Sequence, residues 1–169
     1  MPPIPEIARW AVVIAFTAIV AFAAVNDVRE RKIPNWTVLA CLALFLPWAL
    51  VHPLVWDGWA LGAGVIAFAV SFGLYSAGLI GAGDSKLFSA TALFAGLGHL
   101  PMLAFATALV GGVIALVSLV ARPTRALVMV KLRGKGDFGA GVPYGVAIAA
   151  AAALVLWGGL LAPSSAAFR

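Results

Sequence analysis

The chain has 169 residues, of which 64% are hydrophobic and only 10% are charged, whereas soluble domains are about 45–50% apolar and about 25% charged. This balance excludes an ordinary soluble protein and predicts one integral membrane domain over residues 1–169. The single cysteine, Cys41, excludes an intramolecular disulfide and a multi-cysteine zinc site. The net charge of +5 does not indicate nucleic-acid binding, because the basic residues lie mainly in loops between apolar stretches.

Apolar stretches of roughly 20 residues, the length that crosses a bilayer, follow one another along the chain. They predict an all-α, polytopic membrane helix bundle of about six transmembrane helices. The expected helices cover Ile7–Val25, Trp36–Val55, Trp59–Ile80, Ser85–Leu100, Pro101–Val120 and Val142–Leu161. The fourth is only about 24 Å long at 1.5 Å per residue, against a hydrocarbon core of about 30 Å. We therefore expect either a thinner bilayer here or a glycine loop that dips below the surface together with Asp84.

Lysine and arginine residues are concentrated in alternate loops, which indicates the cytoplasmic side of the membrane. Nine of them follow the first, third and fifth expected helices: Arg29, Arg31, Lys32, Lys86, Arg122, Arg125, Lys131, Arg133 and Lys135. Only Arg9 and Arg169 fall on the other side. The pattern predicts that both termini are extracytoplasmic.

Two aspartates, Asp27 and Asp84, stand where the first helix is expected to end and the fourth to begin. Because two spans separate them, we expect both on the cytoplasmic face. A carboxylate at a membrane boundary is costly and usually functional. The residues His52, Asp57 and His99 fall on the opposite face and have no metal-ligand spacing, so we expect no metal site.

Two carboxyl groups held close together cannot easily both ionise, so the pair offers one acid and one base near neutral pH. Such a pair can activate water against a peptide carbonyl without a metal or a covalent intermediate. Gly81 and Gly83 let the backbone turn sharply and approach another group closely. Asp27 is expected to follow a helix C-terminus and Asp84 to precede a helix N-terminus, so the helix dipoles favour the charge on Asp84 and the proton on Asp27.

Each of these residues also has a structural interpretation. Asp84 could cap the fourth helix, and Asp27 could be a solvated loop acid. Lys86 and Arg29 are typical orientation signals. The remaining polar and proline residues could simply begin helices: Pro34 and Asn35 the second, with Asn35 as its cap, and Pro143 the sixth.

Three short motifs stand at the cytoplasmic ends of the expected helices. They are Asp27 with Arg29, Lys32, Ile33, Pro34 and Asn35; the run Gly81-Ala82-Gly83-Asp84-Ser85-Lys86; and the run Val142-Pro143-Tyr144-Gly145. In this order they resemble the first aspartate motif, the GxGD motif with its trailing lysine, and the proline–glycine motif of the type IV prepilin peptidase family. Val146 departs from that pattern, because many members have proline there.

The resemblance implies an intramembrane aspartic endopeptidase of the inner (plasma) membrane. Such an enzyme removes the short basic leader from pilin or pilin-like precursors at the cytoplasmic face. Carried over to this chain, the catalytic pair is Asp27 and Asp84, and the supporting motif residues are Gly81, Gly83, Lys86, Arg29, Pro34, Asn35, Pro143, Tyr144 and Gly145. The implied partners are the precursor proteins and the lipid bilayer, with no nucleic acid and no cofactor.

Larger members of that family carry an insertion with paired cysteines and also methylate the new pilin N-terminus. With one cysteine, this chain resembles the short form found in tight-adherence (Flp-type) pilus systems, so we expect no N-methyltransferase activity. The main alternative is a small transporter that uses the two aspartates as proton or cation sites. A structural subunit of a pilus or secretion assembly is a third interpretation, but it does not explain why two acids lie on the same face.

Overall fold

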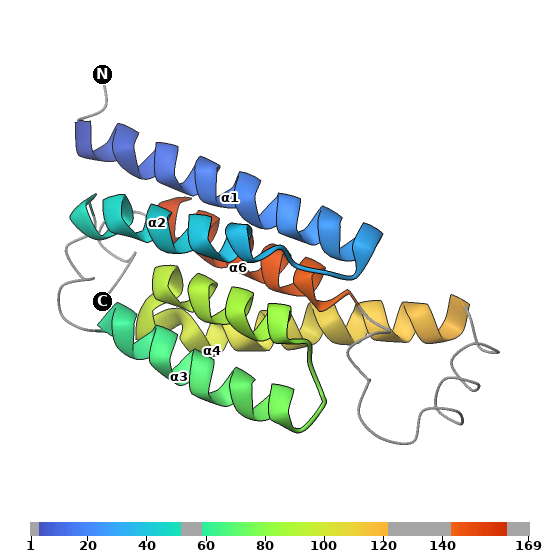
Figure 1. The fold of residues 1–169 in the computed structure, drawn as a ribbon. Helices are drawn as coiled ribbons and strands as arrows, with labels where there is room; N and C mark the ends of the chain where they lie inside the picture. The colour runs from blue at the N-terminus through green and yellow to red at the C-terminus, as the bar shows by residue number, and fades with distance from the viewer. Residues whose placement is uncertain (1–3, 52–58, 122–142, 162–169) are drawn as a thin grey trace.

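The computed structural model describes residues 4–51, 59–121 and 143–161. This part of the chain is almost entirely helical, with no strand in the described residues. The helices are α1 (Ile4–Glu30), α2 (Asn35–Val51), α3 (Trp59–Ser76), α4 (Ala82–Ala121) and α6 (Tyr144–Leu161). The predicted all-α bundle is therefore confirmed, and Figure 1 shows the helices lying side by side.

Three of these helices are long and apolar enough to cross a membrane. They are Glu6–Glu30 in α1, Trp59–Ser76 in α3 and Ala82–Ser118 in α4, while Asn35–Leu50 and Tyr144–Gly159 are shorter apolar helices. The chain is thus a membrane protein by composition and by structure. The loop expected to carry five basic residues, from Arg122 to Lys135, lies outside the described residues. His52 and Asp57 lie outside them as well.

The helix α4 is two segments joined at Gly96. Gly96 has φ 66° and ψ 173°, a conformation that ends the first segment and that is open essentially to glycine alone. The predicted boundary at Leu100 and Pro101 is therefore wrong, since Pro101 is accommodated inside the second segment. The first segment, from Ala82 to the break, is only about 21 Å long at 1.5 Å per residue, which makes the fourth helix even shorter than expected.

The core is built on aromatic contacts in the interior of the bundle. Phe94 of α4 lies against Phe16 of α1, with ring centroids 4.5 Å apart, and against Phe45 and Trp48 of α2. All four side chains are at least nine-tenths buried. Cys41 is fully buried and is a free thiol, as expected for a packed residue of the second helix.

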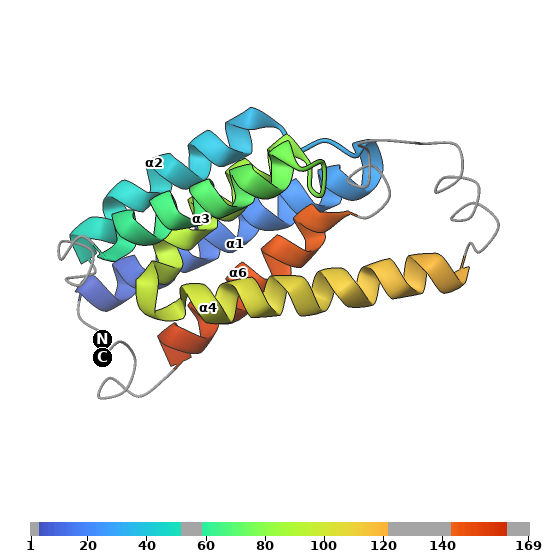
Figure 2. The ribbon, with the colours of Figure 1, turned by 90° about the horizontal axis from the view of Figure 1, so that it is seen from below.

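The helix α6 joins the two sides of the molecule. It packs against both α1 and α4, and Figure 2 shows its first part between α1 and the second segment of α4, which α6 then crosses. Glycine allows close approach at this contact, because a Cβ on Gly111 of α4 would lie 3.0 Å from the ring of Tyr144. Gly111 therefore lets α4 and α6 pack closely.

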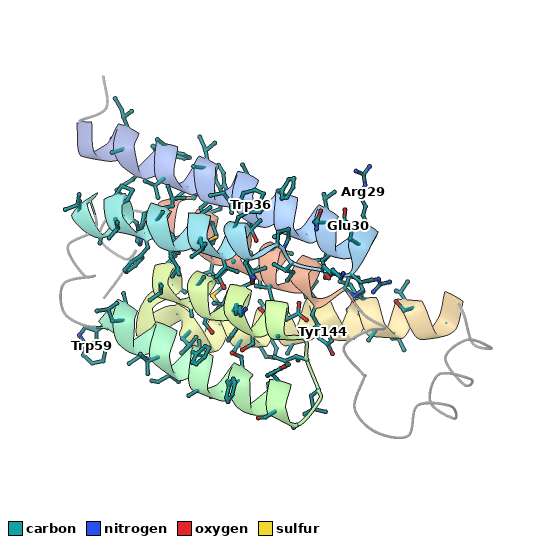
Figure 3. All side chains as sticks on the ribbon, viewed as in Figure 1. Arg29, Glu30, Trp36, Trp59 and Tyr144 are labelled. Atoms are coloured by element: carbon teal, nitrogen blue, oxygen red, sulfur yellow. The ribbon has the colours of Figure 1, made fainter. Side chains whose placement is uncertain are left out.

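One end of the bundle collects the parts that carry the sequence motifs. At this end α1 and α3 stop and α2, α4 and α6 begin (Figure 1). Tyr144 marks this end in Figure 3, and Trp59, at the start of α3, marks the other. The second segment of α4 returns to the motif end and extends past it (Figures 1 and 2).

Candidate active site

Asp27 and Asp84 line one open cavity at the motif end of the bundle. The cavity has a volume of about 320 Å³. The two side chains are 7% and 8% exposed. Residues that line the cavity besides the two acids are Arg31, Lys32, Ile33, Asn35, Gly81, Ala82, Gly83 and Lys86. The structure therefore brings together the two aspartates that the sequence places 57 positions apart (84 minus 27).

Asp84 lies in the first turn of α4 and caps it. Its Oδ2 atom accepts a hydrogen bond of 3.2 Å from the backbone N–H of Gly81, while the carbonyl oxygen of Gly81 accepts one of 3.1 Å from the N–H of Ser85. The contact of Asp84 is one half of a capping box, in which an acid three residues into the helix accepts the N–H of the cap residue. The contact of Ser85 is the first backbone hydrogen bond of the helix, because Gly81 has no side chain. A Cβ on Gly81 would lie 2.9 Å from the same oxygen, so glycine is what lets the carboxylate approach. The capping interpretation of Asp84 is thus confirmed for one oxygen, and the side chain still faces the cavity.

Asp27 lies within α1, in its last turn, rather than after it. Its Oδ2 atom accepts a hydrogen bond of 2.8 Å from the backbone N–H of Gly145. Gly145 belongs to the first turn of α6, where N–H groups have no partner inside the helix. A Cβ on Gly145 would lie 2.9 Å from that oxygen and 3.0 Å from Cβ of Asp27. The proline–glycine motif therefore contributes a backbone donor, not a side chain, to the site.

These positions remove the reason for placing the proton on Asp27. That assignment assumed Asp27 beyond a helix C-terminus and Asp84 before an N-terminus. Both placements are wrong, because each aspartate lies inside its helix and each has one oxygen bonded to an N–H at a helix start. Among the described residues, the other oxygen of each carboxyl group accepts no hydrogen bond. The two acids thus have similar local settings.

The turn from α1 to α2 forms a second wall of the cavity. Arg31 ends α1 with φ 55°, and its N–H donates to the carbonyl oxygen of Asp27 over 3.0 Å. The side chain of Asn26 donates to the carbonyl oxygen of Lys32 over 3.0 Å and so fixes the turn to α1. Ile33 then packs against the GxGD turn, because a Cβ on Gly83 would lie 3.1 Å from Cβ of Ile33. A side chain at position 83 would therefore require Ile33 to shift by a few tenths of an ångström.

The other predicted supporting residues divide into two groups. Lys86 lines the cavity and donates from Nζ to Oδ1 of Asn35 over 3.2 Å, so the side chain of Asn35 binds Lys86 and does not cap α2. The carbonyl oxygen of Pro34 accepts the N–H of Thr37 and begins α2. Arg29, by contrast, is exposed and points away from the bundle (Figure 3), and it does not line the cavity.

Pro143 and Tyr144 are placed as the motif predicts, at the start of α6. The carbonyl oxygen of Pro143 accepts the N–H of Val146 over 3.2 Å, which opens the helix. The side chain of Tyr144 packs on Gly111. Neither residue lines the cavity.

A buried cluster of hydroxyl groups supports the start of α4 and was not expected from the sequence. Ser71 of α3 forms a hydrogen bond of 2.9 Å with the hydroxyl of Ser85, and Ser89 donates to the carbonyl oxygen of Ser85 over 2.7 Å. Ser71 and Ser85 are at most 3% exposed. The cluster holds the turn that carries Asp84 against α3. Isolated serines in apolar stretches give no signal of such pairing.

The sequence indicated only a role in membrane orientation for Arg31 and did not predict that this residue lines the cavity. Within the described residues, no three His, Cys, Asp or Glu side chains gather as a metal site would require. The cavity therefore combines the almost fully buried carboxyl groups of Asp27 and Asp84 with three basic side chains, those of Arg31, Lys32 and Lys86.

Comparison with known proteins agrees with the motifs. A model of the type IV leader peptidase family matches residues 14–116, a range that includes Asp27 and Asp84 and ends before Pro143. No curated protein and no solved structure matches the chain. Since the matched range covers more than half of the sequence, the chain belongs to the type IV leader peptidase family.

Proposed function

We propose that this protein is an intramembrane aspartic endopeptidase that removes the short basic leader from pilin or pilin-like precursors. The observation that carries the proposal is the shared cavity of Asp27 and Asp84, both more than nine-tenths buried, in a chain of the leader peptidase family. We take residues 1–169 as one peptidase domain and Asp27 and Asp84 as its catalytic pair.

The reaction needs the pair to hold one proton between them, which mutual repulsion of two close carboxylates favours. The ionised carboxyl takes a proton from water as the water oxygen bonds to the peptide carbonyl carbon. The protonated carboxyl gives its proton to the carbonyl oxygen. The resulting diol then collapses: one hydroxyl returns a proton to the pair, the C–N bond breaks, and the leaving nitrogen takes a proton from the other carboxyl. The pair ends with one proton, as it began.

The hydrogen bonds that the two carboxyl groups accept support this role. Each carboxyl group is fixed by a backbone N–H through Oδ2, from Gly81 for Asp84 and from Gly145 for Asp27. Within the described residues the other oxygen of each carboxyl group accepts no hydrogen bond, so it can bind water or substrate. Rigid backbone donors hold catalytic groups in place without side-chain entropy loss at the moment of reaction.

The position of the site suits a substrate with a membrane segment. Asp84 begins a helix of about 21 Å, which is shorter than the hydrocarbon core of about 30 Å. The cavity is therefore within reach of an apolar substrate segment that lies in the bilayer. We place the site on the cytoplasmic face of the inner membrane, with six spans and extracytoplasmic termini, because Arg31, Lys32 and Lys86 line it and basic residues mark that face. We further propose cleavage without N-methylation, because the one cysteine is the buried Cys41.

The test is leader cleavage by the purified protein in detergent. A pilin-like precursor from the same source is incubated with the parent protein, with Asp27→Asn and with Asp84→Asn, and the product is identified by mass. We expect a shortened product from the parent only. Cleavage by either variant at the parent rate would remove that aspartate from the mechanism. Proton or cation flux into liposomes that needs both acids, with no cleavage of any precursor, would favour the transporter instead.

A further inference from the structure

Near the site, the two helices that carry the acids meet in a small buried cluster of Ala23 of α1, Leu87 of α4 and Ile148 of α6. The helix pairs that pack closely are α1 with α2 and α6, and α4 with α2, α3 and α6. The ring contact between α1 and α4 is Phe16 with Phe94, and Phe94 lies two residues before the break at Gly96, at the other end of the bundle. Few contacts join α1 and α4 directly, so the separation of Asp27 and Asp84 also depends on the elements that pack on both helices.

One such connection runs through α6. Gly145 binds Asp27, and Tyr144 beside it packs on Gly111 in the second segment of α4. The contact of Tyr144 reaches α4 beyond the break at Gly96, and Ile148 of α6 shares a buried cluster with Leu87, three residues after Asp84. This connection therefore holds α4 by apolar packing inside the bundle.

The other connection runs through the turn between α1 and α2. Its beginning is tied to α1 by the hydrogen bond from Asn26 to Lys32. Its end is tied to the first turns of α4 by Ile33 packed on Gly83 and by the hydrogen bond of 3.2 Å from Lys86 to Asn35. Lys86 lies two residues after Asp84, and both partners line the cavity.

We propose that Asn35 and Lys86 are positioning residues, whose hydrogen bond beside the cavity helps to fix the separation of Asp27 and Asp84. The inference rests on the proposed function. An exposed hydrogen bond of this kind adds little to folding. A small displacement of catalytic groups, in contrast, costs about 10²-fold in rate for roughly 1 Å. Loss of the contact is therefore expected to lower the rate while the bundle stays folded.

A competing explanation is that Lys86 acts through its charge on the carboxyl groups or on the substrate. Asn35→Leu separates the two, since it removes the contact and leaves every charge in place. The charged groups around the pair, namely Arg31, Lys32 and Lys86, are the same in that variant. If the acids move apart, their mutual repulsion weakens, and the acidic and basic limits of the pH–rate profile come closer together.

The experiment compares Asn35→Leu, Lys86→Met, the double variant and Lys86→Arg with the parent, using leader cleavage as the readout. Thr17→Val is the matched control, because it removes another contact between helices, the 3.0 Å hydrogen bond from Trp157 to Thr17, far from the cavity. Thermal unfolding in detergent is measured for every protein.

We expect kcat to fall about 10-fold or more in each single variant, with KM within about 2-fold of the parent. The double variant should fall no further than the single ones, because the same contact is lost only once. Lys86→Arg should recover most of the rate, Thr17→Val should cleave as the parent does, and the pH–rate profile of Asn35→Leu should be narrower.

The inference would be overturned if Asn35→Leu cleaved as the parent does and kept its pH profile. If Asp27→Asn and Asp84→Asn were inactive in the same experiment, the proposed function would still stand. Losses that multiply in the double variant would overturn it too, since they would show that Lys86 acts independently of Asn35. Cleavage by the aspartate variants would overturn the proposed function itself, and the inference with it.

Discussion

Gly145 donates its backbone N–H to Oδ2 of Asp27 over 2.8 Å, across 118 positions of the sequence. The contact explains why a glycine stands there, since a Cβ on Gly145 would lie 2.9 Å from the oxygen it binds. Real Cβ atoms almost never come that close to another heavy atom. The third sequence motif and the first aspartate motif are thus one structural unit, made by the start of α6 and the end of α1.

Replacing Gly145 with alanine should therefore displace the carboxyl group of Asp27. We expect kcat/KM for leader cleavage to fall at least about 10-fold, because catalysis tolerates little misplacement. Gly158→Ala is the matched control: it lies in the same helix with nothing within 4 Å of an added Cβ. Circular dichroism should show both variants folded. Gly145→Ala with parent activity would mean that the carboxyl group is free to move without loss.

The sequence predicted that Asp27 and Asp84 lie on the same face of the membrane, for a physical reason. Each apolar stretch crosses the bilayer once, so an even number of spans between two residues places both on the same side. It could not predict the backbone donor from Gly145, since an N–H group is present at every residue and only the fold directs one to an acid. The break at Gly96 was also missed. Several glycines and a proline stood nearby, and only the backbone angles distinguish the one that turns the chain.

Arg31 holds a backbone conformation that L-residues other than asparagine and aspartate rarely adopt, with φ 55°. Arg31→Asn and Arg31→Val both remove the charge, so their difference in stability isolates the backbone. We expect Arg31→Asn to be at least as stable as the parent. The β-branched valine should cost about 1–2 kcal/mol relative to asparagine. Unfolding in mixed detergent micelles measures this difference, and equal stability of the two variants would contradict a left-handed residue at this turn.

Gly96 ends the first segment of α4 with φ 66° and ψ 173°. An added Cβ would meet nothing within 4 Å, so any effect of Gly96→Ala comes from the backbone and not from crowding. We expect a loss of about 1–3 kcal/mol. Gly98→Ala, two residues later and equally uncrowded, is helical and should keep its stability or gain up to about 1 kcal/mol. If both variants unfolded alike, the break would not depend on the angles of Gly96.

The orientation of the bundle can be tested with single cysteines, because the natural Cys41 is fully buried and should not react with a membrane-impermeant maleimide. Ala77 is exposed in the turn after α3, at the end of the bundle that holds Asp27 and Asp84. Gly98 is exposed at the opposite end, next to the break at Gly96. Since the basic residues of the cavity should face the cytoplasm, Ala77→Cys is expected to be labelled in inside-out vesicles only. Gly98→Cys should be labelled in intact spheroplasts only. The parent protein, unlabelled in both preparations, is the control, and the reverse pattern would place the two aspartates outside the cytoplasm, where a leader that stays in the cytoplasm could not reach them.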